Sequence, residues 1–254
     1  PEGTDDGDDG ALKKRPMIRP ASLADWIYPR RCALCDGVLG KKERYVCALC
    51  RENLPEPVGQ PRCMRCGKPL TGREQEFCYD CGHYEQNFER GQGIFLYQGE
   101  IRESMMRFKF RGRKEYGAFF GGMMLLYGQE FLRQVRPQVI VPVPVHWRKL
   151  RTRGYNQAQV LAEVISSGLS IPLRTDLVLR KKFTVAQKKL NRKERKKNLE
   201  AAFYARPEAG NYERILLVDD IYTTGSTVNA VAAKLKEQGA GQVYVLVACI
   251  GGGD

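Results

Sequence analysis

The chain has 254 residues, 43% of them hydrophobic, so it can bury a real core as one large domain or two unequal ones. Its formal net charge is +13, and the first ten residues hold five acids and no base, so the rest is more basic than the total shows. This balance favours a polyanionic partner. A membrane helix is excluded, because the most apolar segment, Tyr116 to Tyr127, is too short and contains Gly121 and Gly122.

Residues 1–10 do not resemble an export signal, because they are acidic where a signal peptide would be basic. We therefore expect a cytoplasmic protein with no membrane insertion. Composition and motifs predict three parts: an acidic flexible leader over residues 1–20, a cysteine-rich module over residues 21–88, and an α/β domain over residues 89–254. Closely spaced cysteines in the cytoplasm are more often metal ligands than disulfides.

The cysteine-rich module contains an internal repeat. Each half reads C-x2-C-x11-C-x2-C, and the second half starts 31 residues after the first. One C-x2-C pair forms a knuckle, and two knuckles complete a tetrahedral zinc site with four sulfur ligands. The repeat predicts a double zinc ribbon with two zinc ions, bound by Cys32, Cys35, Cys47 and Cys50 in the first half and by Cys63, Cys66, Cys78 and Cys81 in the second.

We expect each half to bind its own ion, because the residues that flank the knuckles match between the halves. An interleaved arrangement would use the same eight ligands, and iron–sulfur ligation fits the long spacer less well. Because so short a module buries little apolar surface, we expect the bound metal to hold it folded. Its basic side chains favour nucleic-acid binding, and a purely structural role stays open. The ninth cysteine, Cys249, is expected to be a buried side chain of a strand.

Strand and helix patterns alternate after residue 90. The predicted strands are 93–97, 138–145, 173–180, 214–219 and 242–250, and the predicted helices are 100–110, 115–135, 156–167 and 228–238. Such alternation indicates a mostly parallel sheet that is covered on both faces. Ligands of these sheets bind beyond the carboxyl ends of the strands.

The most informative segment is ILLVDDIYTTGST, residues 215–227. An apolar strand is predicted to end at Asp219 and Asp220, before a hydroxyl-rich loop and a helix. Backbone N–H groups at a helix start favour a phosphate, and Gly225 lets the backbone approach it. Further donors come from the hydroxyls of Thr223, Thr224, Ser226 and Thr227, and the carboxylates suit ribose hydroxyls. The segment predicts a site for a phosphorylated sugar.

A second loop is expected beside the first, at the end of the strand over residues 138–145. It carries Arg148, Lys149, Arg151 and Arg153 before Gly154. Arginine forks and a flexible glycine suit a pyrophosphate group.

Residues 215–227 resemble the phosphoribosyl-pyrophosphate loop of type I phosphoribosyltransferases. Two further motifs, V-P-V-P-x-H…R-T-R-G-Y-N-Q from residue 141 and T-x-x-Q-x-x-L-x-R-x-x-R-x-x-N-L from residue 184, make the chain similar to the ComF/GntX family. That family joins a zinc module to a phosphoribosyltransferase domain. The resemblance implies that Asp219 and Asp220 hold the ribose hydroxyls and act in catalysis, that residues 223–227 wrap the 5-phosphate, and that Mg²⁺ accompanies phosphoribosyl pyrophosphate.

The same resemblance implies a protein of natural transformation that handles incoming single-stranded DNA, with a ComFA-type helicase as partner. Residues 180–197 hold ten basic side chains and one acid. This basic arm is expected either to close over the pyrophosphate or to contact DNA through Lys188, Lys189, Arg192, Lys193 and Arg195. Two functions stay open: a DNA-handling protein that binds phosphoribosyl pyrophosphate, and an active phosphoribosyltransferase with an unidentified nitrogenous acceptor.

Overall fold

The computed structural model describes residues 29–72, 74–180 and 198–252. The chain divides into residues 1–30 and a compact unit over residues 31–254, and the description below concerns this second unit. The acidic leader predicted over residues 1–20 and the residues of the basic arm beyond Arg180 lie outside the described part of the chain.

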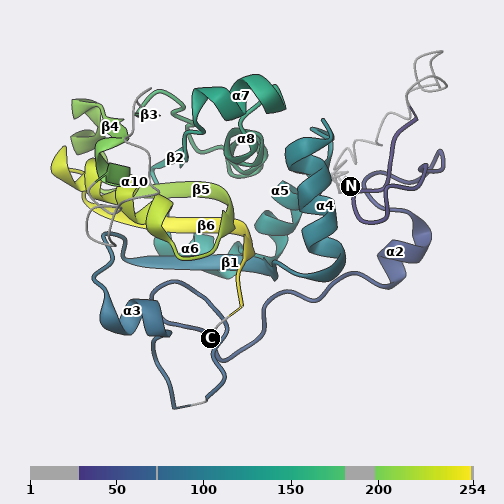
Figure 1. The fold of residues 1–254 in the computed structure, drawn as a ribbon, viewed down its shortest axis with the longest axis horizontal. Coiled ribbons are helices and arrows are strands. Elements are labelled where there is room, and N and C mark those ends of the chain that lie inside the picture. The colour runs from purple at the N-terminus through teal and green to yellow at the C-terminus, as the bar shows by residue number, and fades with distance from the viewer. Residues whose placement is uncertain (1–28, 73, 181–197, 253–254) are drawn as a thin grey trace, which may run out of the picture. The chain divides into compact units, whose positions relative to one another are not determined.

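A four-stranded sheet forms the centre of the unit, with its strands in the order β1-β6-β5-β2 (Figure 1). All three pairings are parallel, which confirms the predicted parallel α/β architecture. The strands are β1 (Arg90–Leu96), β2 (Val139–Pro142), β5 (Arg214–Tyr222) and β6 (Gln242–Ile250).

Helices and a small second sheet cover the two faces of the central sheet. One face carries α4 (Gly99–Phe110), α5 (Tyr116–Tyr127), α6 (Gln129–Val135) and α8 (Gln157–Leu169). The other carries α10 (Ser226–Glu237) and an antiparallel pair, β3 (Val178–Arg180) with β4 (Phe203–Ala205), followed by the 3-10 helix η2 (Pro207–Asn211). No helix among the described residues is both long and apolar enough to cross a bilayer.

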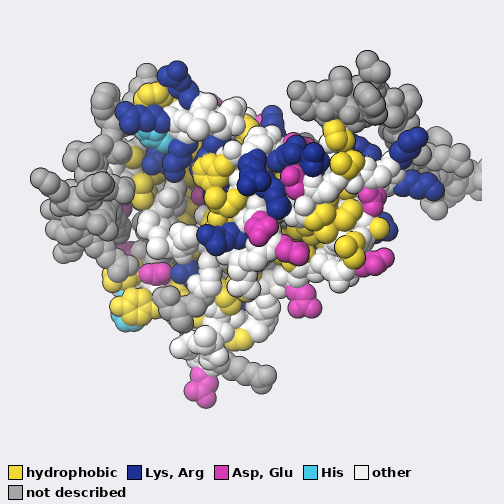
Figure 2. All heavy atoms as spheres, turned by 45° about the vertical axis from the view of Figure 1, so that its right-hand side comes forward, with side chains coloured by type: hydrophobic (Ala, Val, Ile, Leu, Met, Phe, Trp, Pro, Cys, Tyr) yellow, Lys and Arg dark blue, Asp and Glu magenta, His cyan; other side chains and the backbone are white. Residues whose placement is uncertain are grey.

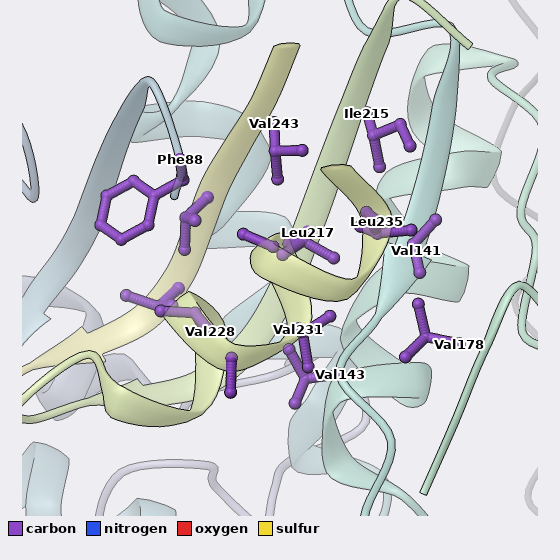
Figure 3. Close-up of a cluster of buried hydrophobic side chains, with 14 of the residues drawn as sticks. Phe88, Val141, Val143, Val178, Ile215, Leu217, Val228, Val231, Leu235 and Val243 are labelled. Carbon is purple, nitrogen blue, oxygen red and sulfur yellow. The ribbon is translucent and has the colours of Figure 1, made fainter. Parts of the chain in front are cut away.

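Both faces of strand β5 are buried, which explains why its sequence is a continuous apolar run. Successive side chains of a strand point to opposite faces. Ile215 and Leu217 join the hydrophobic cluster under α10, which Figure 3 shows, whereas Leu216 and Val218 join the cluster under α4 and α5. All four are fully buried, so neither face of this strand tolerates a polar residue before Asp219.

Three predicted elements differ from the structure. The helix over residues 115–135 is two helices that meet at Gly128, where a Cβ atom would collide with the Met124 carbonyl oxygen. The strand over residues 138–145 ends at Pro142, and beyond it the Val143 N–H still donates to the Val218 carbonyl at 2.9 Å. Of the strand over residues 173–180, only its last three residues pair with β4, while Leu173 forms an isolated bridge to Ile140.

The two halves of the cysteine repeat pack on opposite sides of the sheet. The first half, with the short helix α2 (Ala48–Glu52), lies on α4, where Arg107 Nη1 donates a hydrogen bond to the Leu34 carbonyl at 2.8 Å. The second half, with α3 (Tyr79–His83), lies against β1, where the Gly91 N–H donates to the Arg65 carbonyl at 2.7 Å. Cys32 belongs to one hydrophobic cluster and Cys66 to the other, so each half shares its core with the sheet.

Candidate functional site

The eight cysteines of the repeat form two groups of four, one in each half of the repeat. Within each group, all sulfur atoms lie within 4.8 Å of one another. The Sγ atoms of Cys35 and Cys47 are 3.8 Å apart, and those of Cys66 and Cys78 are 3.6 Å apart. A tetrahedral site with Zn–S bonds of about 2.3 Å places its sulfurs roughly 3.8 Å apart. Both groups are therefore compatible with a zinc ion.

The thiols of the second group perturb one another strongly. Hydrogen bonds from Cys66, Cys78 and Cys81 lower the pKa of Cys63. In the opposite direction, hydrogen bonding within the group raises the pKa of Cys66 and of Cys81. Four thiols this close share their protons unevenly, and zinc binding releases such protons by stabilising the thiolates.

Asp219 and Asp220 lie within β5 rather than after it, because the strand continues to Tyr222. The prediction that the strand ends at these carboxylates is therefore wrong. Pairing with β6 holds this end of the strand, with Asp219 opposite Val247 and Tyr222 opposite Ile250. The two carboxylates are neighbours in a strand, and their surroundings differ.

Asp220 pairs with Lys109 at the C-terminal turn of α4. Lys109 Nζ lies 2.9 Å from Asp220 Oδ1, and the two side chains are only 14% and 12% exposed. A charge this buried requires a partner, which explains why a helix from one face of the sheet carries a lysine in its last turn.

Asp219 has no such close pair among the described residues. Burial and the charge of Asp220 together raise its pKa to about 7, although Lys109 and Arg180 act to lower it. Burial lowers the pKa of Arg180, at the end of β3, and the negative charge of Asp219 opposes this shift. Its Nε atom is buried without a hydrogen-bond partner in the described part of the chain.

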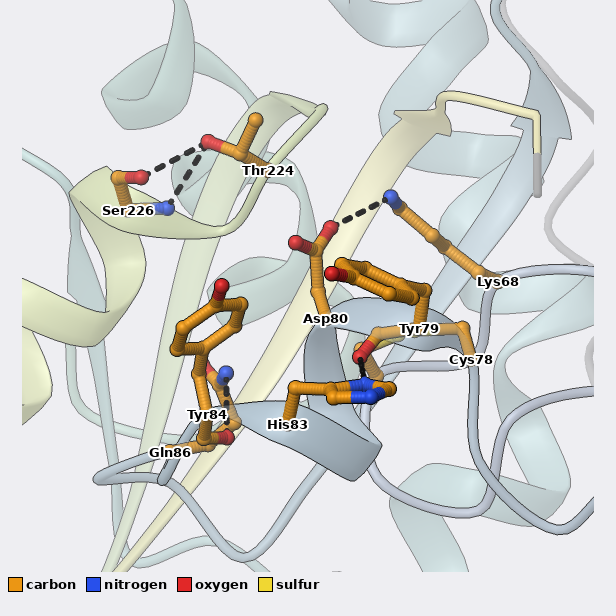
Figure 4. A network of polar contacts seen from close by, with 10 residues as sticks. Lys68, Cys78, Tyr79, Asp80, His83, Tyr84, Gln86, Thr224 and Ser226 are labelled. Atoms are coloured by element: carbon orange, nitrogen blue, oxygen red, sulfur yellow. Dashed lines mark hydrogen bonds and ion pairs between the residues drawn. The ribbon is translucent and has the colours of Figure 1, made fainter. Parts of the chain in front are cut away.

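The hydroxyl-rich loop connects β5 to α10. Thr223 and Thr224 lie in the loop, and Ser226 and Thr227 form the first turn of α10. The Thr224 and Ser226 hydroxyls are 2.8 Å apart, as Figure 4 shows, and the Ser226 N–H donates to Thr224 Oγ1 at 3.4 Å. Gly225 has φ +72°, and a side chain there would collide with the Tyr222 ring, so glycine is required for both reasons.

The segment predicted as the second loop is mostly helical, so the predicted loop conformation is wrong, while its binding of a pyrophosphate stays a prediction. Helix α7 covers Trp147–Arg153, its N-cap is His146, whose Nδ1 accepts from the Arg148 N–H at 3.3 Å, and it ends at Gly154 with φ +80°. Gly154 therefore serves as a left-handed helix end. The helix was missed in the sequence because it has no Ser, Thr, Asp or Asn at the N-cap position.

The helix distributes its basic side chains over different environments. Arg148 lies over the Trp147 ring at 5.4 Å, and both it and Arg151 are exposed. Arg153 lies over the Phe110 ring at 4.7 Å and donates to Gln157 Oε1 at 2.9 Å. Lys149 links α7 to the end of β5 through charge interactions with groups on other elements. Its side chain is exposed, and partial desolvation together with the positive charges of Arg153, Arg180 and Lys109 lowers its pKa, while Asp220 raises it.

The structure thus brings basic groups from three elements toward these carboxylates: Lys109 from α4, Lys149 from α7 and Arg180 from β3. Lys149 and Arg180 belong to basic segments of the sequence, but nothing there distinguishes them from their neighbours. Lys109 gave one signal, since it follows the buried Phe108 on an amphipathic helix and lies away from that helix's solvent face.

Basic side chains elsewhere on the described surface gather in patches. Figure 2 shows lysine and arginine in groups with acidic side chains between them, so the face it presents is not uniformly basic. The predicted DNA-binding residues of the basic arm, Lys188, Lys189, Arg192, Lys193 and Arg195, fall outside the described residues, and their role stays a prediction.

Known proteins identify the family. Residues 23–82 match the model of the double zinc ribbon domain. Competence protein F of Haemophilus influenzae is 32% identical over 221 residues, covering 85% of this chain and 94% of the relative. This chain belongs to the ComF/GntX family. Competence protein ComFC of Bacillus subtilis is 27% identical to this ComF-family chain, covering 84% of it and 91% of the relative.

Further relatives and one solved structure complete the comparison. The DNA utilization protein YhgH of Escherichia coli K12 is 29% identical, covering 87% of this ComF-family chain and 97% of the relative. A purine phosphoribosyltransferase from Pyrococcus horikoshii Ot3 is similar over 52% of this chain and 73% of that chain, at 20% identity and a TM-score of 0.36.

Proposed function

We propose that this ComF-family chain binds phosphoribosyl pyrophosphate at the end of β5 and handles incoming single-stranded DNA in natural transformation. The observation that carries the proposal is the set of groups around the strand end. Two carboxylates, a hydroxyl-bearing loop and the start of α10 lie on one connection, and basic side chains from α4, α7 and β3 act on the same carboxylates.

Each part of the ligand has a chemically matched partner in this set. The Thr223–Thr227 segment offers hydroxyls and the N–H groups of a 12-residue helix to the 5-phosphate. Asp219 and Asp220 accept hydrogen bonds from the ribose hydroxyls. Lys109, Lys149 and Arg180 neutralise the pyrophosphate together with a Mg²⁺ ion, which prefers phosphate and carboxylate oxygens. Among the arginines of α7, Arg153 already acts on Lys149, whereas Arg148 and Arg151 would have to turn toward the ligand.

The zinc ribbons form the second part of the proposal. Each group of four cysteines would bind one Zn²⁺, with the ligands Cys32, Cys35, Cys47 and Cys50, and Cys63, Cys66, Cys78 and Cys81. Because the ribbons share their cores with the two faces of the sheet, the ions would stabilise the helix that carries Lys109 as well as the ribbons.

The role in transformation rests on the relatives. Those named competence proteins and DNA utilization proteins cover most of this chain. A net charge of +13 and a dense basic arm suit a DNA backbone. A ComFA-type helicase would be the partner that delivers or receives the strand.

A calorimetric titration tests the ligand assignment. Phosphoribosyl pyrophosphate with Mg²⁺ should bind more tightly than ribose 5-phosphate or pyrophosphate alone, because each of these fills only part of the site. If pyrophosphate binds as tightly as phosphoribosyl pyrophosphate, the basic side chains form a general anion site, and the site does not recognise the ribose.

An active phosphoribosyltransferase is the second candidate. It is favoured by the pKa of Asp219, which burial raises to about 7, so that this carboxyl can exchange a proton near neutral pH. Release of pyrophosphate from phosphoribosyl pyrophosphate, screened against free nucleobases and single-stranded DNA, tests it. Release with one acceptor would establish turnover, and tight binding without release would assign a binding role.

A further inference from the structure

Tyr222 lies between the second cysteine group and the hydroxyl-rich loop. It is the last residue of β5, it is 3% exposed, and it shares a hydrophobic cluster with Cys63, Cys66 and Cys78. Its hydroxyl is buried and has no hydrogen-bond partner within the described residues. A buried hydroxyl without a partner is costly, so this group marks a place where a partner is expected.

The nearby acceptors are the sulfurs of the second group. Burial raises the pKa of Tyr222, and the neighbouring cysteines Cys66, Cys81 and Cys78 raise it further, Cys66 by acting on the hydroxyl directly as well as through charge. Zinc would convert these thiols to thiolates, which accept hydrogen bonds far better than thiols do. Hydrogen bonds to metal-bound ligands are a general means of fixing a site.

The hydroxyl end of the Tyr222 ring also supports the loop. A Cβ atom built on Gly225 would collide with the Tyr222 hydroxyl oxygen and ring, so the loop backbone lies directly against this side chain. The ring itself is fixed by Phe88, whose centroid lies 6.4 Å away in an edge-on arrangement. A second link ties the same ribbon to α10, since the Asn87 side-chain amide donates to Asn229 Oδ1 at 3.1 Å.

We propose that Tyr222 is a positioning residue that joins the second zinc site to the phosphate-binding loop: its hydroxyl donates to the metal-bound Cys66 thiolate, and its ring supports Gly225. The second zinc ion would thus set the shape of the loop as well as hold the ribbon. The part of this inference that concerns ligand affinity rests on the proposed binding of phosphoribosyl pyrophosphate.

The test uses Tyr222→Phe in the full chain, which keeps the ring against Gly225 and removes the hydroxyl. Tyr116→Phe is the matched control. Tyr116 is also buried, and its hydroxyl donates to Asp36 in the first ribbon. In the cadmium-substituted protein, each tetrathiolate site gives its own cadmium NMR resonance, and Cys81→Ser assigns the second one.

Three readouts are expected. Tyr222→Phe should move the second cadmium resonance and speed metal loss from that site by about tenfold, the fold-change expected when a hydrogen bond to a charged group is removed. Hydrogen exchange of the amides of residues 223–227 should rise in this variant and on metal removal. Affinity for phosphoribosyl pyrophosphate should fall by a similar factor. Tyr116→Phe should leave all three unchanged.

The outcomes separate the two proposals. An unmoved second resonance together with unchanged metal loss would overturn the hydrogen bond to Cys66. A shifted resonance with unchanged loop exchange would overturn the link to the loop. If the wild-type chain does not bind phosphoribosyl pyrophosphate, the proposed function fails, and the resonance and exchange measurements still decide the role of Tyr222.

Discussion

Lys109 Nζ lies 2.9 Å from Asp220 Oδ1, and this ion pair connects the end of α4 to the end of β5. The first ribbon supports the same helix, through the Ser104 hydroxyl on the Ala33 carbonyl and through Arg107 on the Leu34 carbonyl. The second ribbon lies on the other side of the strand end, where Tyr222 shares a hydrophobic cluster with Cys63, Cys66 and Cys78. Both ribbons therefore stabilise the candidate site.

The ion pair predicts a large stability effect. Lys109→Met should lower the free energy of unfolding by about 3 kcal/mol, because it leaves the buried Asp220 carboxylate unpaired. Adding Asp220→Asn should recover most of the loss. Denaturant unfolding of both single variants and the double variant measures the coupling.

Lys234→Met is the control for this prediction. Lys234 pairs with Glu237 at 2.7 Å, but Glu237 is 52% exposed, so the loss should stay below about 1 kcal/mol. Additive effects of Lys109→Met and Asp220→Asn would show that the two side chains do not depend on each other.

Asp219 predicts a pH dependence of stability. Its pKa is raised from 3.8 to about 7 in the folded protein, so between these values the folded state holds a proton that the unfolded state releases. The stability contributed by this group is therefore lost as pH rises from about 4 to 7. Asp219→Asn lacks this dependence, so the stability of wild type relative to the variant should fall between pH 5 and about pH 7.5.

Urea unfolding at several pH values measures this difference directly, since the other titrating groups are common to both proteins. A wild-type-minus-variant difference that stays constant, or that rises with pH, would mean that Asp219 is ionised throughout this range.

The sequence predicted those parts of the fold that depend on local pattern. The run from Ile215 to Val218 identified a strand buried on both faces, and Gln242 to Ile250 matches β6 at both ends. The cysteine spacing predicted two compact sulfur groups. These features need only periodicity or ligand spacing.

What it could not predict depends on packing between distant segments. Nothing near Lys109 indicates that it meets a residue 111 positions later, and the sequence places Tyr222 after the strand, with no sign of its packing against Gly225 and the second cysteine group. His146 was missed as a helix start, since imidazole is an uncommon cap. Helices α5 and α6 meet at Gly128, where a Cβ atom would collide with the Met124 carbonyl oxygen, and the sequence does not reveal this close approach.

The cysteine groups predict two zinc ions per chain by elemental analysis. Cys81→Ser should retain one, and chelation should lower the melting temperature, because the ribbons share their cores with the sheet. Cys249→Ala is the control: this cysteine is buried in β6 outside both groups, so two ions should remain. A count of two in Cys81→Ser would remove that residue from the ligand set.

The basic arm predicts salt-dependent DNA binding. Replacing Lys188, Lys189, Arg192, Lys193 and Arg195 with Gln should flatten the plot of log affinity for single-stranded DNA against log salt concentration, by about 0.7 for each phosphate that the arm no longer neutralises. A charge-matched control replaces five exposed basic residues of the described body: Arg102, Arg111, Lys114, Arg133 and Arg136. Equal slopes in the two variants would show that net charge, rather than the arm, attracts the DNA.

Calorimetric titration of Asp219→Asn and Asp220→Asn with phosphoribosyl pyrophosphate and Mg²⁺ tests the central claim most directly. Each variant removes a carboxylate acceptor while keeping its shape, and each should weaken binding by about tenfold or more, because hydrogen bonds to a charged group are removed. Glu237→Gln, at the far end of α10, should bind as the wild type does. Wild-type affinity in both aspartate variants would contradict a ribose site at the end of β5.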